Sequence, residues 1–364
     1  MKIKELTAWL ESIAPLSLQE SYDNAGLITG NPETEITGVL VCLDSTEEIV
    51  MEAVRNKCNL IVAHHPIVFS GLKKINGKNY VERTVIQAIR NDIAIYAIHT
   101  NLDNVYQGVN QKIANKIGLK NLGILTPKKA MLRKLSVFVP EKNSEDLRSA
   151  LFAAGAGNIG NYDSCSFNVS GIGTFRGNED SNPAIGEKGQ LQKEAEQKVE
   201  VIFEAWKERH ILSAMKNVHP YEEVAYDVYS LENEYQYVGS GMIGELESEM
   251  EEDAFLLHLK RSMKAQCVRH TQFLRKKVRK VAICGGSGSF LLQDAIRQGA
   301  DCFVSGDFKY HQFFDADGKI LIADIGHYES EQFTMELLKD LILKKNTKFA
   351  VRLTELDTNP VNYI

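Results

Sequence analysis

Two adjacent histidines end an apolar run in the first quarter of the chain. His64 and His65 stand in the stretch "VAHHPIVF". Neutral imidazole is a common metal ligand, so the pair could begin a metal site. A histidine pair in apolar surroundings can equally be structural, because histidine is intermediate in burial. The pair alone does not separate these two interpretations, and the other ligand-type residues must decide.

Histidines and carboxylates also follow three other apolar runs. They are His99 and Asp103 after "IAIYAI", Asp307 and His311 after "CFVS", and His327 and Glu331 after "ILIADIG". If each run is a strand, all four strand ends meet at one edge of a sheet, where open α/β sheets bind ligands. The i, i+4 spacing of His327 and Glu331 places both on one helical face. This convergence predicts a metal site.

The adjacency of His64 and His65 indicates more than one ion. Neighbouring side chains on a strand point in opposite directions, and Pro66 interrupts the strand, so the two imidazoles can diverge. Three histidines with two carboxylates exceed the four ligands of one tetrahedral zinc. The set suits two metal ions, with a carboxylate able to bridge them.

Alternating strands and helices must position these residues. Apolar β-rich runs lie at 36–46, 59–69 and 93–103 and alternate with helical patterns; the same order returns over 279–345. This alternation predicts an α/β domain with a mixed sheet. Between about 132 and 231 the order is β-α-β-β-α-β, which is typical of a ferredoxin-like α+β unit. We therefore expect one α/β domain, split into residues 1–130 and 235–364, with a ferredoxin-like domain inserted at 131–234.

Composition limits the class of protein. The 364 residues include 44% hydrophobic and 25% charged residues, with a formal net charge of -6. This balance argues against binding driven by nucleic-acid phosphates, and the basic stretch 269–280 is predicted to be a solvated face. Six scattered cysteines without a CxxC pair, no secretory pattern in the amphipathic first helix and no membrane-length apolar run predict a cytoplasmic location.

The glycine run 285–289 could cradle a phosphate, but it lacks the P-loop lysine, so a tight turn is favoured.

Several motifs together resemble one family. These are "SYDNAGL", "VAHHPIVF", "AIHTNLDNVYQGVN", "VAICGGSGS", "SGDFKYH" and "DIGHYESE". They are similar, in order, to the motifs of the Nif-three-like family, also called GTP cyclohydrolase I type 2 homologues. The match covers both halves of the split domain. The middle segment, with "HPYEEVAYDVY", resembles the inserted P-II/CutA-like domain of the longer bacterial members.

The resemblance implies a dinuclear metal centre and an assembly. By motif, the ligands would be His64, His65, Asp103, His327 and Glu331, with Glu331 bridging. The metal would be zinc, although iron or manganese also suits histidine and carboxylate ligands with open positions. Family members resemble toroidal hexamers with the metal sites facing an internal cavity, so a homohexamer is expected here.

The function expected from this site is metal-dependent hydrolysis. His99, Asp307 and His311 are candidates for acid/base catalysis or for supporting the ligands. The family name implies opening of the purine ring of GTP. However, the sequence shows neither a P-loop nor a cluster of arginines at the strand ends that would bind a triphosphate. The alternative is a metal-binding regulatory or adaptor protein whose inserted domain senses a small molecule or a partner. Nucleic-acid binding through "RKKVRK" at 275–280 fits the acidic composition least.

Overall fold

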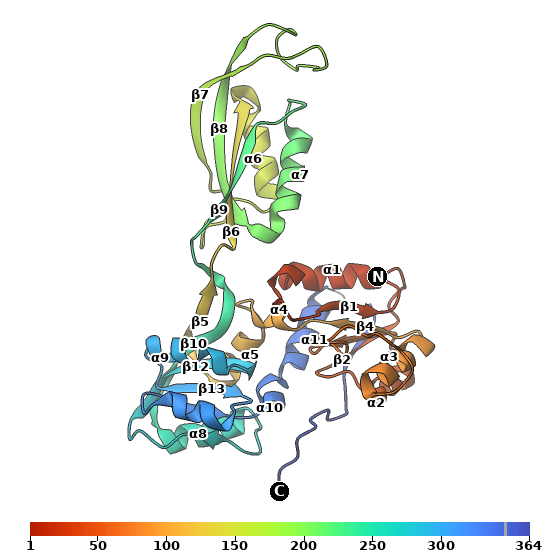
Figure 1. The fold of residues 1–364 in the computed structure, drawn as a ribbon, viewed down its shortest axis with the longest axis vertical. Coiled ribbons are helices and arrows are strands. Elements are labelled where there is room, and N and C mark those ends of the chain that lie inside the picture. Colours follow the sequence, from red (N-terminus) through yellow and green to blue (C-terminus); the bar gives the residue numbers. More distant parts are fainter. Residues whose placement is uncertain (346–347) are drawn as a thin grey trace. The chain divides into compact units, whose positions relative to one another are not determined.

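The computed structural model describes residues 1–345 and 348–364 (Figure 1). The chain divides into two compact units, one formed by residues 1–127 and 236–364 and the other by residues 128–235. Among the described residues, no helix has the length and apolar character needed to cross a membrane.

The first sheet of the split unit has five strands in the order β1-β4-β3-β2-β15. Its strands are β1 (Gly26–Thr29), β2 (Gly38–Cys42), β3 (Leu60–Ala63), β4 (Ala94–Ala97) and β15 (Ala350–Leu353). All pairs are parallel except the pair of β1 with β4. β2, β3 and β4 are buried along their whole lengths, as expected for parallel strands covered on both faces.

Helices cover both faces of this sheet. They are α1 (Ile3–Ile13), α2 (Glu47–Arg55), α3 (Tyr80–Arg90) and α11 (Thr334–Lys345). α2 and α3 share one apolar core with β2, β3 and β4, whereas α11 packs against α1 and β2. Thr46 and Asn79 cap the N-termini of α2 and α3 with their side-chain oxygens, which fixes where these helices begin.

The second sheet of the same unit has six strands in the order β11-β14-β13-β12-β10-β5. Its strands are β5 (Lys120–Lys128), β10 (Tyr235–Glu251), β11 (Arg269–His270), β12 (Lys277–Ser287), β13 (Cys302–Gly306) and β14 (Leu321–Asp324). β12, β13 and β14 run parallel, whereas β10 is antiparallel to β12 and β11 is antiparallel to β14. The accompanying helices are α4 (Thr100–Asp103), α5 (Val109–Ile117), α8 (Glu252–Ser262), α9 (Leu292–Arg297) and α10 (His327–Glu331).

The presence of two sheets corrects the expectation of a single sheet edge. β3 and β4 belong to one sheet, whereas β13 and β14 belong to the other. The reason is that β5 does not extend the first sheet beyond β4 but lies beside β10. The four strand ends that carry ligand-type residues therefore come from two sheets, and α10 follows β14 directly.

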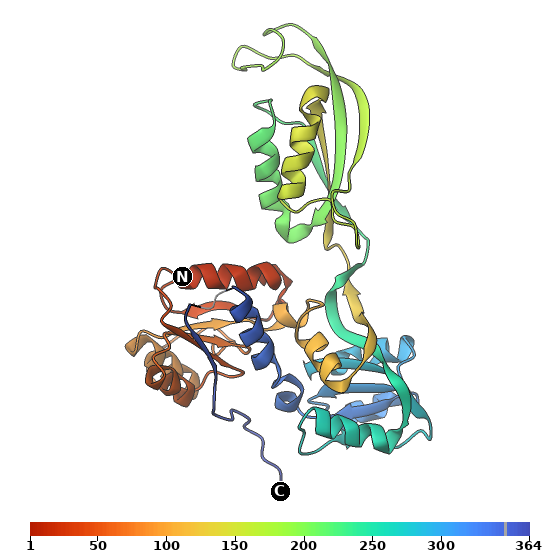
Figure 2. The ribbon, with the colours of Figure 1, turned by 180° about the vertical axis from the view of Figure 1, so that it is seen from behind.

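The unit of residues 128–235 contains one four-stranded sheet with strand order β7-β8-β6-β9, antiparallel throughout. Along the chain its elements are β6 (Leu132–Pro140), α6 (Ser144–Ala153), β7 (Phe167–Phe175), β8 (Gln192–Glu204), α7 (Glu208–Val218) and β9 (Tyr226–Leu231). Figure 2 shows both helices on the same face of this sheet. Alternate residues of β6 and β8 join the helices in one apolar core.

Candidate metal centre

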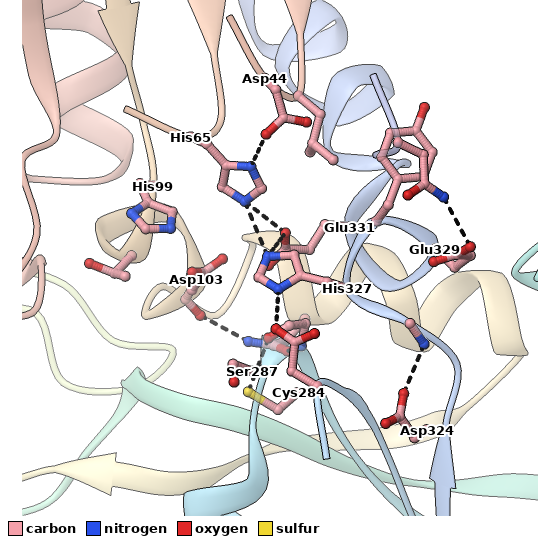
Figure 3. Close-up of a pocket in the computed structure, with 18 of the residues that line it drawn as sticks. Asp44, His65, His99, Asp103, Cys284, Ser287, Asp324, His327, Glu329 and Glu331 are labelled. Atoms are coloured by element: carbon pink, nitrogen blue, oxygen red, sulfur yellow. Dashed lines mark hydrogen bonds and ion pairs between the residues drawn. The ribbon is translucent and has the colours of Figure 1, made fainter. Parts of the chain in front are cut away.

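The five residues expected to bind metal lie together in the split unit. Figure 3 shows four of them, His65, Asp103, His327 and Glu331. His64 and His65 follow β3 directly, Asp103 ends α4, and His327 and Glu331 are the first and last residues of α10. All except the fully buried His64 line a cleft of about 870 Å³.

Glu331 is shared by two groups of ligand atoms. In the first group, His64 Nε2 lies 3.7 Å from both Asp103 Oδ1 and Glu331 Oε1. In the second group, Glu331 Oε2 lies 2.9 Å from His65 Nε2 and 3.1 Å from His327 Nε2. Within each group the ligand atoms lie within 4.8 Å of one another. One carboxylate thus presents a separate oxygen to each of two groups of possible ligand atoms.

Each histidine of the cluster is held through its Nδ1 atom. The partners are the Ile98 carbonyl for His64 at 2.9 Å, and, each at 2.7 Å, Asp44 for His65, Asp307 for His327 and Asp23 for His99. Partners of this kind fix the tautomer and orientation of metal-binding histidines. With Nδ1 held in this way, Nε2 is the ring atom through which each histidine could bind a metal.

Two buried atoms of the first group have no hydrogen-bond partner. These atoms are His64 Nε2 and Asp103 Oδ1. Burial lowers the pKa of His64, and burial together with the charge of Glu331 raises the pKa of Asp103. A buried lone pair facing a buried carboxylate oxygen is costly unless a cation satisfies both. The donor set of this group therefore fits a divalent cation.

The second group lies in a strongly negative electrostatic environment. Burial alone would lower the pKa values of its histidines, but hydrogen bonds and charge interactions with carboxylates raise the pKa of His65 to about 10. Glu331 and Asp307 likewise raise the pKa of His327 to about 11. Both shifts mean that the surroundings favour positive charge at the position where these Nε2 atoms meet Glu331.

The three acid/base candidates have different positions. The His99 ring lies 5.3 Å from the rings of both His64 and His65, and its ligand atom forms a third close group with theirs. Asp307 lines the cleft and supports His327. The structure does not bring His311 to the cluster, because the chain after β13 enters the 3-10 helix η5 (Tyr310–Ala316), where His311 is exposed against the Phe314 ring.

Two supporting residues were missed in the sequence. Asp44 lies two residues beyond the end of β2, so the strand-end argument could have found it. Asp23 lies in a loop, and its fully buried carboxylate also accepts a hydrogen bond from the Thr100 amide at 3.0 Å. No local pattern indicates that a loop aspartate will meet a histidine 76 residues later.

The glycine run 285–289 forms the end of strand β12 and the start of the 3-10 helix η4 (Ser289–Leu291), rather than the expected turn. Its amides already donate to side chains: Gly285 to Asn110 Oδ1 at 3.0 Å, Gly286 to Ser330 Oγ at 2.9 Å and Gly288 to Ser305 Oγ at 2.9 Å. Gly286 has φ of +62°, and a Cβ atom there would collide with Glu331 Oε1. The glycine at this position of β12 therefore leaves Glu331 the space it occupies between the two groups.

Comparisons with known proteins cover the whole chain. The model of the family Duf34/NIF3 (NGG1p interacting factor 3) matches residues 1–360. Proteins named GTP cyclohydrolase 1 type 2 homolog are 39% identical in Halalkalibacterium halodurans, over 97% of this chain and 96% of that protein, and 36% identical in Bacillus subtilis, over 99% and 98%.

Solved structures also match the whole chain. A Bacillus cereus protein related to NIF3 has a TM-score of 0.88 and 38% identity, covering 100% of this chain and 99% of that one. A Staphylococcus aureus protein has a TM-score of 0.79 and 31% identity at the same coverage. The expected relation of the middle unit to CutA-type proteins stays a prediction. The family match and the full-length relatives together mean that this chain belongs to the Duf34/NIF3 family.

Proposed function

We propose that this protein is a metal-dependent hydrolase that holds two divalent ions. His64 and Asp103 would bind one ion, His65 and His327 the other, and Glu331 would bridge them. The observation that carries this proposal is the position of Glu331, whose two oxygens face two separate groups of ligand atoms. Zinc is the expected metal, and iron or manganese suits the same donors.

The ions, when bound, would lower the pKa of water and polarise the bond to be hydrolysed. The chain itself would move protons. Asp23 accepts a hydrogen bond from the Nδ1–H of His99. The Nε2 atom of His99 is therefore available to take a proton from the attacking water and to return it to the leaving group. Although burial opposes it, hydrogen bonds from His99 and Thr100 lower the pKa of Asp23 to about 2, which keeps this support ionised.

The lining of the cleft favours a substrate with a planar ring. Tyr22 and Phe69 are 62% and 49% exposed, and their ring centroids lie 6.1 Å apart at the cleft. The Phe69 ring lies 6.3 Å from that of His99. Exposed aromatic rings beside a catalytic candidate suit a planar heteroaromatic group. The relatives' name, which contains GTP cyclohydrolase, agrees with a purine ring.

The same lining does not favour a triphosphate. Seven acidic side chains line the cleft, whereas Arg269 is the one lysine or arginine among the described lining residues. Arg269 already pairs with Asp324 and donates to the Phe308 carbonyl. We therefore propose a ring-containing substrate with little negative charge, and GTP itself is the weaker candidate.

A substrate screen with reconstituted protein tests the hydrolase. Purified protein loaded with zinc, iron or manganese is assayed against purine nucleosides, bases and nucleotides. Turnover by the wild type, lost in Glu331→Gln and kept in His210→Ala, supports the proposal, because His210 is exposed outside the split unit. No turnover from protein with full metal content, over the whole screen, overturns it.

The alternative function is a metal-binding regulator or adaptor. The observation that favours it is that residues 128–235 form a compact unit with its own apolar core, while all five proposed ligands lie in the other unit. From its strand order, we propose that this unit is ferredoxin-like. A saturable small molecule or protein bound by this unit, together with absent turnover, would favour the adaptor.

The assembly and the nucleic-acid alternative need separate tests. We propose a homohexamer, which sedimentation equilibrium of the purified protein would measure. Binding of nucleic acid is disfavoured because Lys277 and Arg279 of the basic stretch are paired with Glu249 and Glu245. Salt-dependent binding of RNA or DNA fragments would contradict that view.

A further inference from the structure

The chain that follows β15 passes beside the cleft. β15 pairs in parallel with β2, so both strands end at the same edge of the first sheet. The Thr354 amide still donates to the Val41 carbonyl at 2.9 Å. Residues 354–363 therefore leave the sheet next to Asp44, which lies just beyond the end of β2.

Thr358 completes the support of His65. Its hydroxyl donates to Asp44 Oδ2 at 2.9 Å, while Asp44 Oδ1 lies 2.7 Å from His65 Nδ1. The two oxygens of Asp44 thus have different partners, one from residues 354–363 and one from the proposed ligand. A carboxylate held at one oxygen can still turn about its terminal torsion, which is broad and roughly two-fold. The Thr358 hydroxyl restricts that rotation.

The same segment also reaches α10. Asn359 Nδ2 donates to Glu329 Oε1 at 3.2 Å, and Glu329 lies between the proposed ligands His327 and Glu331 on that helix. Asn359, Pro360, Val361 and Tyr363 line the cleft. Residues 354–363 therefore connect Asp44 beyond the end of β2, which holds His65, to α10, which carries His327 and Glu331.

We propose that residues 359–363 form a wall of the metal-binding cleft and that Thr358 is a positioning residue for His65, acting through Asp44. The inference rests on the proposed function, because it takes His65 as a metal ligand. Loss of a partner that orients a metal ligand costs about 10- to 100-fold in metal affinity, and Thr358 acts one bond further out, so we expect a loss of about three- to tenfold.

The test compares two threonines of the same segment. Thr358→Val removes the hydroxyl and keeps the shape of the side chain. The matched control is Thr354→Val, whose hydroxyl bonds Glu52 on α2 and accepts from the Leu356 amide at 3.1 Å, outside the cleft lining. Thr358→Ser keeps the hydroxyl and should restore wild-type behaviour. Co²⁺ is the probe, with its affinity measured by chelator competition and its geometry by visible absorption.

We expect Thr358→Val to weaken one of the Co²⁺ sites and to change its absorption bands, while Thr354→Val lowers the melting temperature and leaves Co²⁺ binding unchanged. Wild-type affinity and spectrum in Thr358→Val, or equal weakening by both variants, would overturn the role of Thr358 and leave the proposed function standing. If the wild type binds no Co²⁺, or if Glu331→Gln binds it as well as the wild type does, the metal centre fails and the role of Thr358 fails with it.

Discussion

His64 Nε2 and Asp103 Oδ1 lie 3.7 Å apart, and each is buried without a hydrogen-bond partner. A buried polar atom without a partner costs about 1–3 kcal/mol. Two such atoms that face each other form an unfavourable arrangement in a protein whose other cluster histidines are well satisfied. A divalent cation between them would satisfy both atoms at once.

Metal content should distinguish Asp103 from Glu331. Asp103→Asn removes a ligand of the first group alone, so it should lose one of two bound ions, whereas Glu331→Gln should lose both because each group needs one of its oxygens. Elemental analysis of the purified variants measures this difference, with His210→Ala as the control that keeps wild-type content. Full metal content in Glu331→Gln would show that this residue is not a bridging ligand.

A methyl group at residue 286 should disturb the same centre. Gly286→Ala places a Cβ against Glu331 Oε1, at a backbone φ that L-residues rarely adopt. We expect lower metal content and a lower melting temperature. Gly123→Ala is the control, since a Cβ there meets no atom within 4 Å and its φ is not positive. Unchanged metal binding in Gly286→Ala would mean that Glu331 can move without loss of the site.

The ring subsite makes a separate prediction about substrate affinity. Phe69→Leu keeps an apolar side chain but loses the aromatic face, so KM should rise about fivefold at constant kcat, since a ring pair contributes about 1 kcal/mol. Tyr310→Leu is the control, because Tyr310 is also exposed but lies outside the cleft lining. Equal KM values in wild type and Phe69→Leu would remove Phe69 from the substrate site.

Acid should destabilise the unit of residues 128–235 through His219. The Nε2–H of His219 donates to the Phe138 carbonyl at 2.9 Å, its Nδ1 accepts from the Tyr221 amide at 3.1 Å, and Glu196 is the charged group that faces it. Burial lowers the pKa of His219, although the carbonyl and Glu196 oppose this shift. Because protonation then favours the unfolded chain, the stability is full above the unfolded pKa of about 6.5 and falls as the pH decreases below it.

Urea unfolding followed by Trp206 fluorescence, in a Trp9→Phe background, measures this unit. The loss of stability between pH 7.5 and 5.5 should shrink in His219→Gln, because glutamine can replace both hydrogen bonds without titrating. His210→Gln serves as the exposed-histidine control. An identical loss in His219→Gln and wild type would assign the pH dependence to other groups.

The sequence predicted the local features of the site better than its architecture. The residues after β3, β4 and β14 were identified because polar side chains at the ends of apolar strands are readable from local pattern. The alternation of strands and helices does not say which strands pair. β5 pairs with β10, which begins at Tyr235, and does not continue the first sheet. This choice depends on tertiary packing between segments that are far apart in the sequence.

The supporting residues show the same limit. Asp44 follows a strand and was within reach of the argument that found His64, whereas Asp23 acts through a fold-dependent contact. His311 follows a strand too, yet the 3-10 helix that begins at Tyr310 turns it to the surface. Proximity to a strand end therefore predicts a place near the cleft, and the next turn of the chain decides whether the side chain reaches it.

The order of the ligands along the chain has a consequence for synthesis on the ribosome. His64, His65 and Asp103 emerge early, whereas α10 with His327 and Glu331 emerges only after the unit of residues 128–235 has been made. The first sheet is also incomplete until β15 emerges to pair with β2. A nascent chain thus carries three of the five proposed ligands beside an open sheet edge. If both ions need Glu331, as proposed, the complete centre would form only after α10 has been translated, near the end of folding.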